Sequence, residues 1–143
     1  AWGIGSSEAE HAMATGTLRL VKPKTMRVTF DGQMAQGVTP KDMALTLIAT
    51  HGAGGGAGHM VEFAGEAVHA LDMEGRMTLC NMATEFSAMA GIIAPDTKTF
   101  AWLAGRPYAP DKFDDPYWQS LTSDEGATFD REIAIDVASI APM

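Results

Sequence analysis

The sequence has a single cysteine, Cys80, in 143 residues. One thiol cannot form a disulfide within the chain, so the fold does not depend on an oxidising compartment, and we expect the protein in the cytoplasm. A lone cysteine is also unable to hold a structural zinc ion or an iron–sulfur cluster by itself, because such sites need several ligands.

Basic residues are scarce as well. Ten Lys and Arg against 18 Asp and Glu give a formal charge of −8, and the basic residues are scattered along the chain. Nucleic acids and anionic membranes attract clustered positive charge, so we expect neither as a partner. No apolar run approaches the length of a bilayer span, which argues against a transmembrane helix.

The N-terminal stretch "AWGIGSSEAEHAM" lacks an initiator methionine, a basic region and an apolar signal region. Trp2 and Ile4, in a glycine-rich approach to a helix, are typical of side chains that pack on preceding structure. We therefore expect an internal fragment of a longer protein. Its 46% hydrophobic and 20% charged residues are those of an ordinary globular domain with its own core.

Strand and helix patterns alternate along the chain. Strands are predicted where apolar residues alternate or form short runs, and helices where a cap precedes helical spacing. The expected order is helix 8–16, strand 24–32, helix 40–50, strand 60–65, a helical turn 66–71, helix 73–90, strand 91–95, helix 97–103, helix 114–121 and strand 128–137. This order predicts an α/β layered domain with a mostly parallel sheet flanked by helices.

Three helix starts have a capping residue, namely Ser6 or Ser7, Thr39 (followed by Pro40) and Asp96. The segment "LVKPK" near residue 22 separates the first helix from the first strand. We expect residues 1–22 to be the C-terminal helix of an upstream domain and residues 23–143 to form the α/β domain.

The glycine-rich segment "HGAGGGAGH" resembles a loose dinucleotide-binding fingerprint. That fingerprint needs a strand before it and a helix N-terminus after it, which direct N–H groups at phosphate. Here the predicted helix precedes the glycines and the predicted strand follows them. A flexible helix-to-strand connection is therefore the preferred interpretation.

Cys80 lies within a predicted helix, away from a helix N-terminus or a nearby cation that would lower its pKa, so we interpret it as a small buried residue. The four histidines, His11, His51, His59 and His69, lack the spacing of a helical zinc site. A metal shared by His51 and His59 is weakly supported, and solvated or structural roles are favoured.

A polar stripe gives the sharper signal. At 100° per residue, Glu74, Thr78, Asn81 and Glu85 fall on one face of the helix predicted over 73–90. The bland interpretation is the solvent face of an amphipathic helix. The functional one is a site, because an amide and a carboxylate one turn apart can orient water or a substrate hydroxyl.

Four long runs resemble the large subunit of 3-isopropylmalate dehydratase (isopropylmalate isomerase), in the aconitase superfamily. They are "GIGSSEAEHAMATGTL", "MEGRMTLCNMATEF", "IIAPDTKTFAWLAGRPYAP" and "SDEGATFDREIAIDVASIAP". The resemblance covers essentially the whole chain and implies the second domain of an enzyme of leucine biosynthesis. That enzyme interconverts 2-isopropylmalate and 3-isopropylmalate by dehydration and rehydration.

The resemblance also implies a [4Fe–4S] cluster in the intact enzyme, with one iron acting as a Lewis acid for loss of water. The family's three cluster-ligating cysteines lie after the point that matches Met143. We therefore expect no cofactor-binding or metal-ligating residue in this chain, and neither a cluster nor activity for the piece alone. The implied partners are the small subunit, the remaining large-subunit domains and a 2-hydroxy diacid substrate.

Residue by residue, "CNMATE" is similar to a family segment whose asparagine and glutamate line the cluster cleft, which gives catalytic roles to Asn81 and Glu85. Cys80 matches a position that is not a ligand. The segments "FSAMAG" and "VEFAGEAVHAL" depart from the family pattern, which keeps open a paralogue for 2-methylmalate, 2,3-dimethylmalate or homoaconitate. A stand-alone, non-catalytic docking domain is the alternative from another class.

Overall fold

The computed structural model describes residues 2–110, 113 and 116–143, which form one four-stranded sheet in the order β3-β2-β1-β4. The strands are β1 (Lys24–Asp31), β2 (His59–Ala64), β3 (Ala90–Ile92) and β4 (Arg131–Asp136). Every pairing between them is parallel, and Val28 lies opposite both Phe63 and Ile133. The predicted α/β class with a mostly parallel sheet is therefore confirmed.

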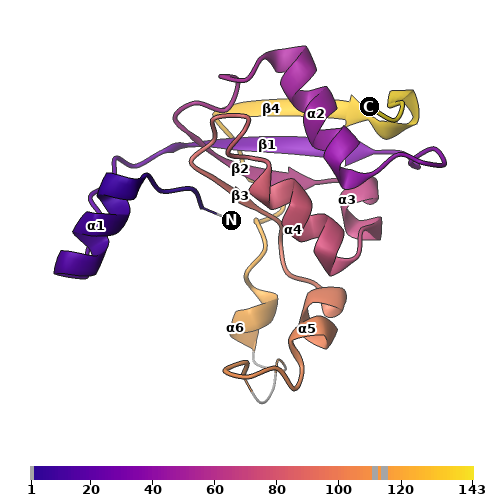
Figure 1. Ribbon diagram of the computed structural model, residues 1–143. Helices are drawn as coiled ribbons and strands as arrows, with labels where there is room; N and C mark the ends of the chain where they lie inside the picture. The colour runs from indigo at the N-terminus through magenta and orange to yellow at the C-terminus, as the bar shows by residue number, and fades with distance from the viewer. Residues whose placement is uncertain (1, 111–112, 114–115) are drawn as a thin grey trace.

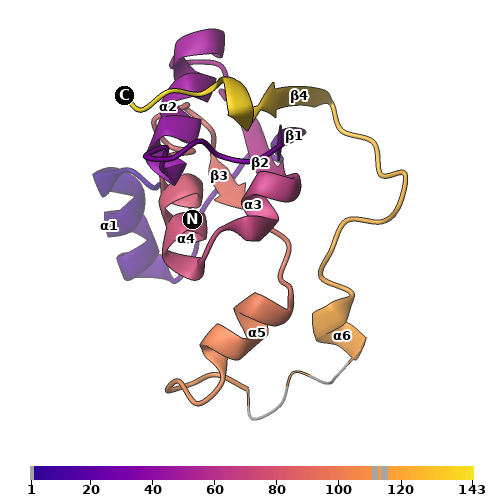
Figure 2. The same ribbon diagram turned by 90° about the vertical axis from the view of Figure 1, so that its right-hand side faces the viewer.

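Some helices of the chain flank this sheet, as predicted, and others lie away from it. The helices are α1 (Ser6–Thr15), α2 (Pro40–His51), α3 (Glu66–Ala70), α4 (Met73–Asn81), α5 (Thr97–Leu103), α6 (Pro116–Gln119) and the short 3-10 helix η1 (Val137–Ser139). In Figures 1 and 2, α2 and α4 cover one face of the sheet, and α5 and α6 project beyond the edge formed by β3. The start of the helix predicted over 114–121 lies outside the described residues.

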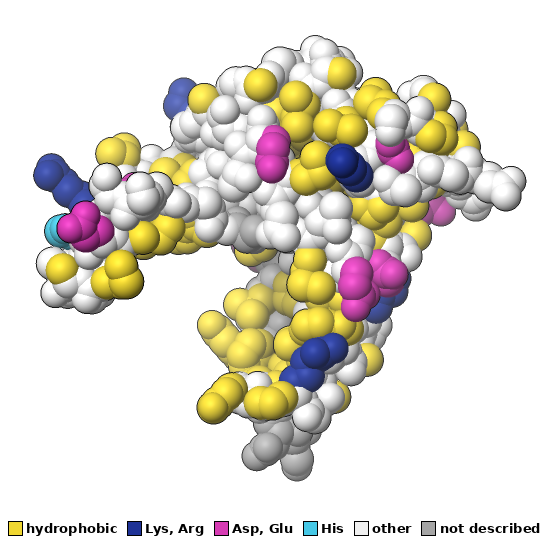
Figure 3. Space-filling model, viewed as in Figure 1, with side chains coloured by type: hydrophobic (Ala, Val, Ile, Leu, Met, Phe, Trp, Pro, Cys, Tyr) yellow, Lys and Arg dark blue, Asp and Glu magenta, His cyan; other side chains and the backbone are white. Residues whose placement is uncertain are grey.

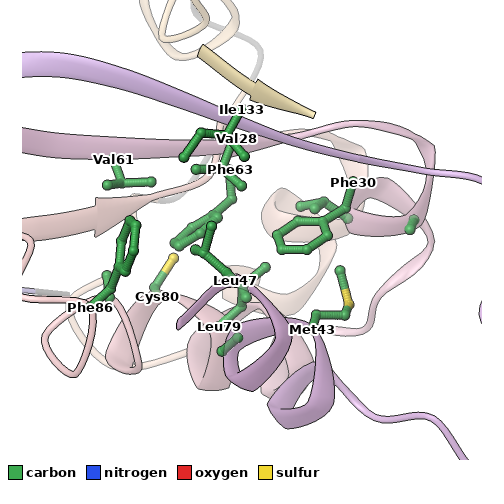
Figure 4. Close-up of a cluster of buried hydrophobic side chains, with 14 of the residues drawn as sticks. Val28, Phe30, Met43, Leu47, Val61, Phe63, Leu79, Cys80, Phe86 and Ile133 are labelled. Carbon is green, nitrogen blue, oxygen red and sulfur yellow. The ribbon is translucent and has the colours of Figure 1, made fainter. Parts of the chain in front are cut away.

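The core lies between the sheet and the α2–α4 layer. Met26, Val28 and Phe30 are fully buried at alternate positions of β1, as the period of two predicted. They meet apolar side chains of α2 and α4, among them Leu47 and Leu79 (Figure 4). The apolar residues that alternate along β1 thus all point to the face of the sheet against which the apolar sides of α2 and α4 pack.

Two sequence predictions need correction. The run "GIIAP", predicted as a strand over 91–95, is fully apolar and so typical of a buried strand, but β3 is at the edge of the sheet and Ile92 is 55% exposed. Helix α1 is capped by Gly5 and not by a serine, because the Glu8 carboxylate reaches back to accept the Gly5 N–H at 2.8 Å. The position of β3 in the sheet and the hydrogen bond between Glu8 and Gly5 both depend on contacts that the pattern of apolar residues does not specify.

Helix α1 stands apart from the sheet in Figure 1, and none of its residues is buried. Trp2, which precedes it, forms an antiparallel bridge with Ala90 on the outer side of β3. None of the helices in the described part of the chain is long and apolar enough to cross a bilayer.

Helix α2 begins after Thr39, the predicted N-cap, and Asp42 in the first turn of the helix forms hydrogen bonds back to this residue. One Asp42 oxygen accepts the Thr39 N–H at 2.7 Å and the Thr39 hydroxyl at 2.6 Å, and the other accepts the Met143 N–H at 2.8 Å. These donors, the Thr39 hydroxyl above all, lower the pKa of Asp42 below its ordinary value. A buried carboxylate therefore joins α2 to residue 143.

We predict that Asp42→Ala lowers the free energy of unfolding at neutral pH and that the deficit shrinks in acid. A depressed folded pKa means that the carboxylate stabilises the fold above its unfolded pKa of about 4 and loses this effect as the pH falls. Urea denaturation between pH 7 and pH 3 measures the difference. Glu10→Ala, an exposed acidic position on α1, is the control, and an equal deficit at both ends of the range would contradict the prediction.

Candidate functional site

The helix that carries the predicted polar stripe is shorter than expected. Helix α4 ends at Asn81, and residues 82–87 form a series of turns. The prediction of a helix from Met73 to Ala90 is therefore wrong beyond Asn81. Glu74, Thr78 and Asn81 lie on α4, whereas Glu85 lies in the turns.

Side-chain and tertiary contacts account for this ending. The Thr84 hydroxyl donates to the Asn81 carbonyl at 2.9 Å and so competes for the acceptor that a continuing helix would use. The neighbouring strand also passes close by, since a Cβ added to Gly91 would lie 2.8 Å from the Cys80 carbonyl oxygen. The Ala88 N–H donates to the Ala83 carbonyl at 2.9 Å and closes the turns.

Asn81 and Glu85 are both exposed, and Thr84 connects them. The Thr84 hydroxyl lies 2.9 Å from the Asn81 carbonyl oxygen and 3.0 Å from a Glu85 carboxylate oxygen. Glu85 is thus held next to the C-terminal end of α4, although it does not share a helical face with Asn81. A solvent-accessible carboxylate and amide can both meet a ligand from outside the domain.

A hollow of about 410 Å³ lies between α4, β3 and α5. Its lining residues are Met73, Arg76, Met77, Cys80, Asn81, Gly91, Ile92, Ile93 and Thr99. The volume is within the range of small-molecule sites, which are mostly apolar with a few polar groups. Asn81 lines the hollow and Glu85 does not. Figure 3 shows hydrophobic side chains gathered where the α5–α6 arm joins the rest of the molecule.

Arg76 is the cationic residue among those that line the hollow, and it is only 3% exposed. Its Nη1 and Nη2 atoms donate to the two Asp96 oxygens at 2.8 Å and 2.6 Å, and Nη2 also donates to the His69 carbonyl at 3.1 Å. The Arg76 guanidinium holds the pKa of Asp96 well below its usual range. The positive charge is therefore already paired inside the fold.

Cys80 is buried, as predicted, and Figure 4 shows its sulfur pointing into the apolar cluster. Burial raises the pKa of the Cys80 thiol above its ordinary value, so the thiol form is favoured. A reactive or metal-binding cysteine needs the thiolate. The interpretation as a small packed residue is confirmed.

The donor set does not fit ligation of a four-iron cluster. Such a cluster needs several thiolates, and the chain has one buried thiol. Among the residues that the structure describes, no group of three or more His, Cys, Asp or Glu side chains could hold a metal ion. His59 instead lies with Nδ1 2.9 Å from the Ala57 carbonyl oxygen, and His69 with Nδ1 3.9 Å from Asp96.

Sequence reasoning did not single out Arg76 or Thr84. Arg76 lies three and four residues before the buried Leu79 and Cys80, so it falls on the apolar face of α4. A charged residue at a core position is the signal that predicts a buried partner. Its partner Asp96 was predicted only as the cap of α5, a role that it also fills by accepting the Thr99 N–H at 3.1 Å.

The chain was also compared with known protein families. The model of the aconitase family (aconitate hydratase) matches residues 1–143. The match therefore includes α4, the turns that follow it and the hollow beside Asn81.

Proposed function

The chain belongs to the aconitase family, and from this membership we propose that it works as one domain of a 3-isopropylmalate dehydratase large subunit. Membership supports an iron–sulfur hydro-lyase-type function in general. The four long runs that resemble the dehydratase large subunit support the finer assignment. The proposed reaction interconverts 2-isopropylmalate and 3-isopropylmalate through loss and return of water.

In this proposal Asn81 and Glu85 contact the substrate. The Asn81 amide donates a hydrogen bond to a substrate oxygen, and Glu85 gives a proton to the hydroxyl that leaves as water and takes one back when water returns, while a base elsewhere in the enzyme removes and returns the C–H proton. Both side chains are exposed at the end of α4, where a cleft wall completed by other parts of the enzyme can reach them. Because the donors of this chain do not fit the cluster, its ligands come from elsewhere in the enzyme.

In this proposal, the hollow beside Asn81 determines substrate specificity by receiving the apolar substituent of the substrate. Four of its lining side chains, Met73, Met77, Ile92 and Ile93, are large and apolar. An isopropyl group buried there would be stabilised by about 0.8 kcal/mol per carbon. A third carboxylate, as in homoaconitate, would lose water contacts there, and the charge of the cation that lines the hollow, Arg76, is already paired by Asp96.

The other parts of the proposal concern assembly. Residues 1–22 expose apolar side chains, including Met13 (83%) and Val21 (84%), and we assign them to an interface with another unit of the enzyme. A small subunit completes the cleft, and the enzyme works in the cytoplasm.

We predict that the complete, cluster-loaded enzyme prefers 2-isopropylmalate over diacids with smaller substituents and over homoaconitate, a tricarboxylate. Each missing methylene in an apolar pocket lowers kcat/KM by roughly tenfold or more, so 2-methylmalate should be a much poorer substrate. Steady-state kinetics with 2-isopropylmalate, 2-methylmalate, 2,3-dimethylmalate and homoaconitate measures the order.

Met77→Glu, which puts a charge into the hollow, should narrow the preference for the isopropyl group, whereas Met13→Glu on α1 should not. A preference for 2-methylmalate or 2,3-dimethylmalate would replace the proposed substrate with that of a paralogue. Turnover of homoaconitate at a comparable rate would show that the hollow does not receive the substituent. Absence of turnover with every diacid would support a docking domain instead.

A further inference from the structure

The glycine-rich loop between α2 and β2 packs against the turns that carry Glu85. A Cβ added to Gly55 would lie 2.3 Å from Cε2 of the Phe86 ring and 3.0 Å from the His51 carbonyl oxygen. One added to Gly56 would lie 2.8 Å from Cδ1 of the same ring and 3.0 Å from Cβ of Ala88. Real Cβ atoms do not approach other atoms to 2.3 Å, so Gly55 cannot carry a side chain without movement.

The Phe86 ring cannot move aside easily. It is fully buried in the apolar core and lies near Val61 and Cys80 in Figure 4. Protein interiors are close-packed, so a displaced ring pushes its own backbone or its neighbours. Phe86 directly follows Glu85 in the chain, and a shift of its backbone moves the carboxylate.

Hydrogen bonds fix the loop and the turns together. The Gly56 N–H donates to the Phe86 carbonyl at 2.8 Å, and the Met89 N–H donates to the His59 carbonyl at 2.8 Å. The Arg131 guanidinium on β4 donates to the Gly55 carbonyl at 2.8 Å, which anchors the loop to the sheet. The turns are thus tied to the loop and to the start of β2 directly after Glu85.

The backbone of these turns is under local strain. Ser87 has a φ of +63°, in the left-handed region that residues other than glycine seldom adopt. Such a conformation persists only where the surroundings determine it. The hydrogen bonds from the Gly56 N–H to the Phe86 carbonyl and from the Met89 N–H to the His59 carbonyl supply that determination on either side of Ser87.

We infer that Gly55 and Gly56 are positioning residues for Glu85, acting through the Phe86 ring and the Gly56 N–H to Phe86 carbonyl bond. The glycine-rich loop then serves close packing and does not bind phosphate. The inference rests on the proposed function for its catalytic consequence. Its structural part, the placement of Glu85, holds independently of the reaction.

The matched control lies within the same loop. An added Cβ at Gly54 would meet no atom within 4 Å, whereas its neighbour Gly55 has the closest clash in the loop. Gly54→Ala and Gly55→Ala therefore differ in their contacts, which for Gly55 are above all with the Phe86 ring and then with the His51 carbonyl oxygen. Glu85→Gln removes the Glu85 carboxylate, so it identifies which ¹³C carboxyl resonance belongs to Glu85, and it gives the activity of the enzyme without this carboxylate.

Two readouts test the inference. The first is the ¹³C resonance of the Glu85 carboxyl group in this chain, measured across pH, which reports its surroundings without activity. The second is the kinetics of the complete, cluster-loaded enzyme. In Gly55→Ala we expect a shifted carboxyl titration and a kcat lower by about tenfold or more at little changed KM, because displacement by about 1 Å costs up to a hundredfold. Gly54→Ala should leave both readouts unchanged.

A folded Gly55→Ala whose Glu85 resonance and titration match Gly54→Ala would overturn the inference, whatever its rate. Unchanged turnover in Glu85→Gln would overturn the proposed catalytic role of Glu85. It would leave the positioning inference open to test, because the ¹³C resonance of Glu85 reports the position of its carboxyl group without activity. If Gly55→Ala does not fold, the pair Gly55→Ala with Phe86→Leu, which removes the ring edge, should restore the fold and the Glu85 signal. Failure of that pair to restore them would also refute the role of Phe86.

Discussion

Glu85→Gln is expected to lower kcat of the complete, cluster-loaded enzyme by about a hundredfold or more, because proton transfer by a positioned side chain contributes on the order of 10² to 10⁴. Glutamine keeps the size of the side chain and can still form a hydrogen bond with the Thr84 hydroxyl, which lies 3.0 Å from the carboxylate. It cannot give up or take a proton. The fold should be retained, since Glu85 is exposed.

The measurement is kcat and KM with cluster content quantified in each preparation, so that loss of cluster is not mistaken for loss of chemistry. Glu74→Gln is the matched control, because Glu74 is an exposed carboxylate on α4 from the same predicted stripe. Its kcat should stay near that of the unmodified enzyme. Full turnover by Glu85→Gln with the cluster present would remove the assigned role.

Much of the fold could be predicted because its signals are local. The alternation of Met26, Val28 and Phe30 requires only that one side of a strand faces the core, and these side chains are buried. Thr39 with Pro40, and Asp96, start helices through contacts within one turn. Local contacts of this kind do not depend on the rest of the fold.

The end of α4 could not be predicted, because it depends on residues distant in the chain. Composition favours a helix to Ala90, but Gly55, Gly56 and Gly91 bring other segments against the residues after Asn81. Propensity is a weak preference that tertiary contacts override. The exposure of Ile92 has the same origin, since a short apolar run does not reveal whether its strand is central or at an edge.

The candidate site was affected in the same way. Helical spacing predicted that Asn81 and Glu85 share a face, yet only Asn81 lies on α4. The burial of Cys80 was predictable, because the chain has no second cysteine with which it could form a disulfide or a metal site and several of its neighbours in the sequence are apolar. The resemblance that gave Asn81 and Glu85 their roles does not depend on helix geometry, so it survives the shortened helix as a proposal.

The ion pair between the buried Arg76 and the partly exposed Asp96 leads to the largest expected effect on stability. Asp96→Ala removes both carboxylate acceptors of a guanidinium that is 3% exposed, so that only the neutral His69 carbonyl and Thr99 hydroxyl still accept from it, and it also removes the cap that accepts the Thr99 N–H. Loss of the anionic partner leaves a buried positive charge without a counter-charge, which costs about 3–5 kcal/mol. That loss is comparable to the whole free energy of unfolding of a small domain, about 5–15 kcal/mol.

Three variants and a pH series test this expectation in urea denaturation. Because the pKa of Asp96 is lowered in the fold, its stabilisation is present above the unfolded pKa of about 4 and declines as the pH falls toward the folded value. Asp96→Ala should therefore lose most at neutral pH. Arg76→Met fills the same space without a charge and should be milder, and the double variant should fall below Arg76→Met only by the lost helix cap, about 0.5–2 kcal/mol. A loss below about 1 kcal/mol in Asp96→Ala, the range of exposed ion pairs, would mean that Arg76 finds another acceptor or water.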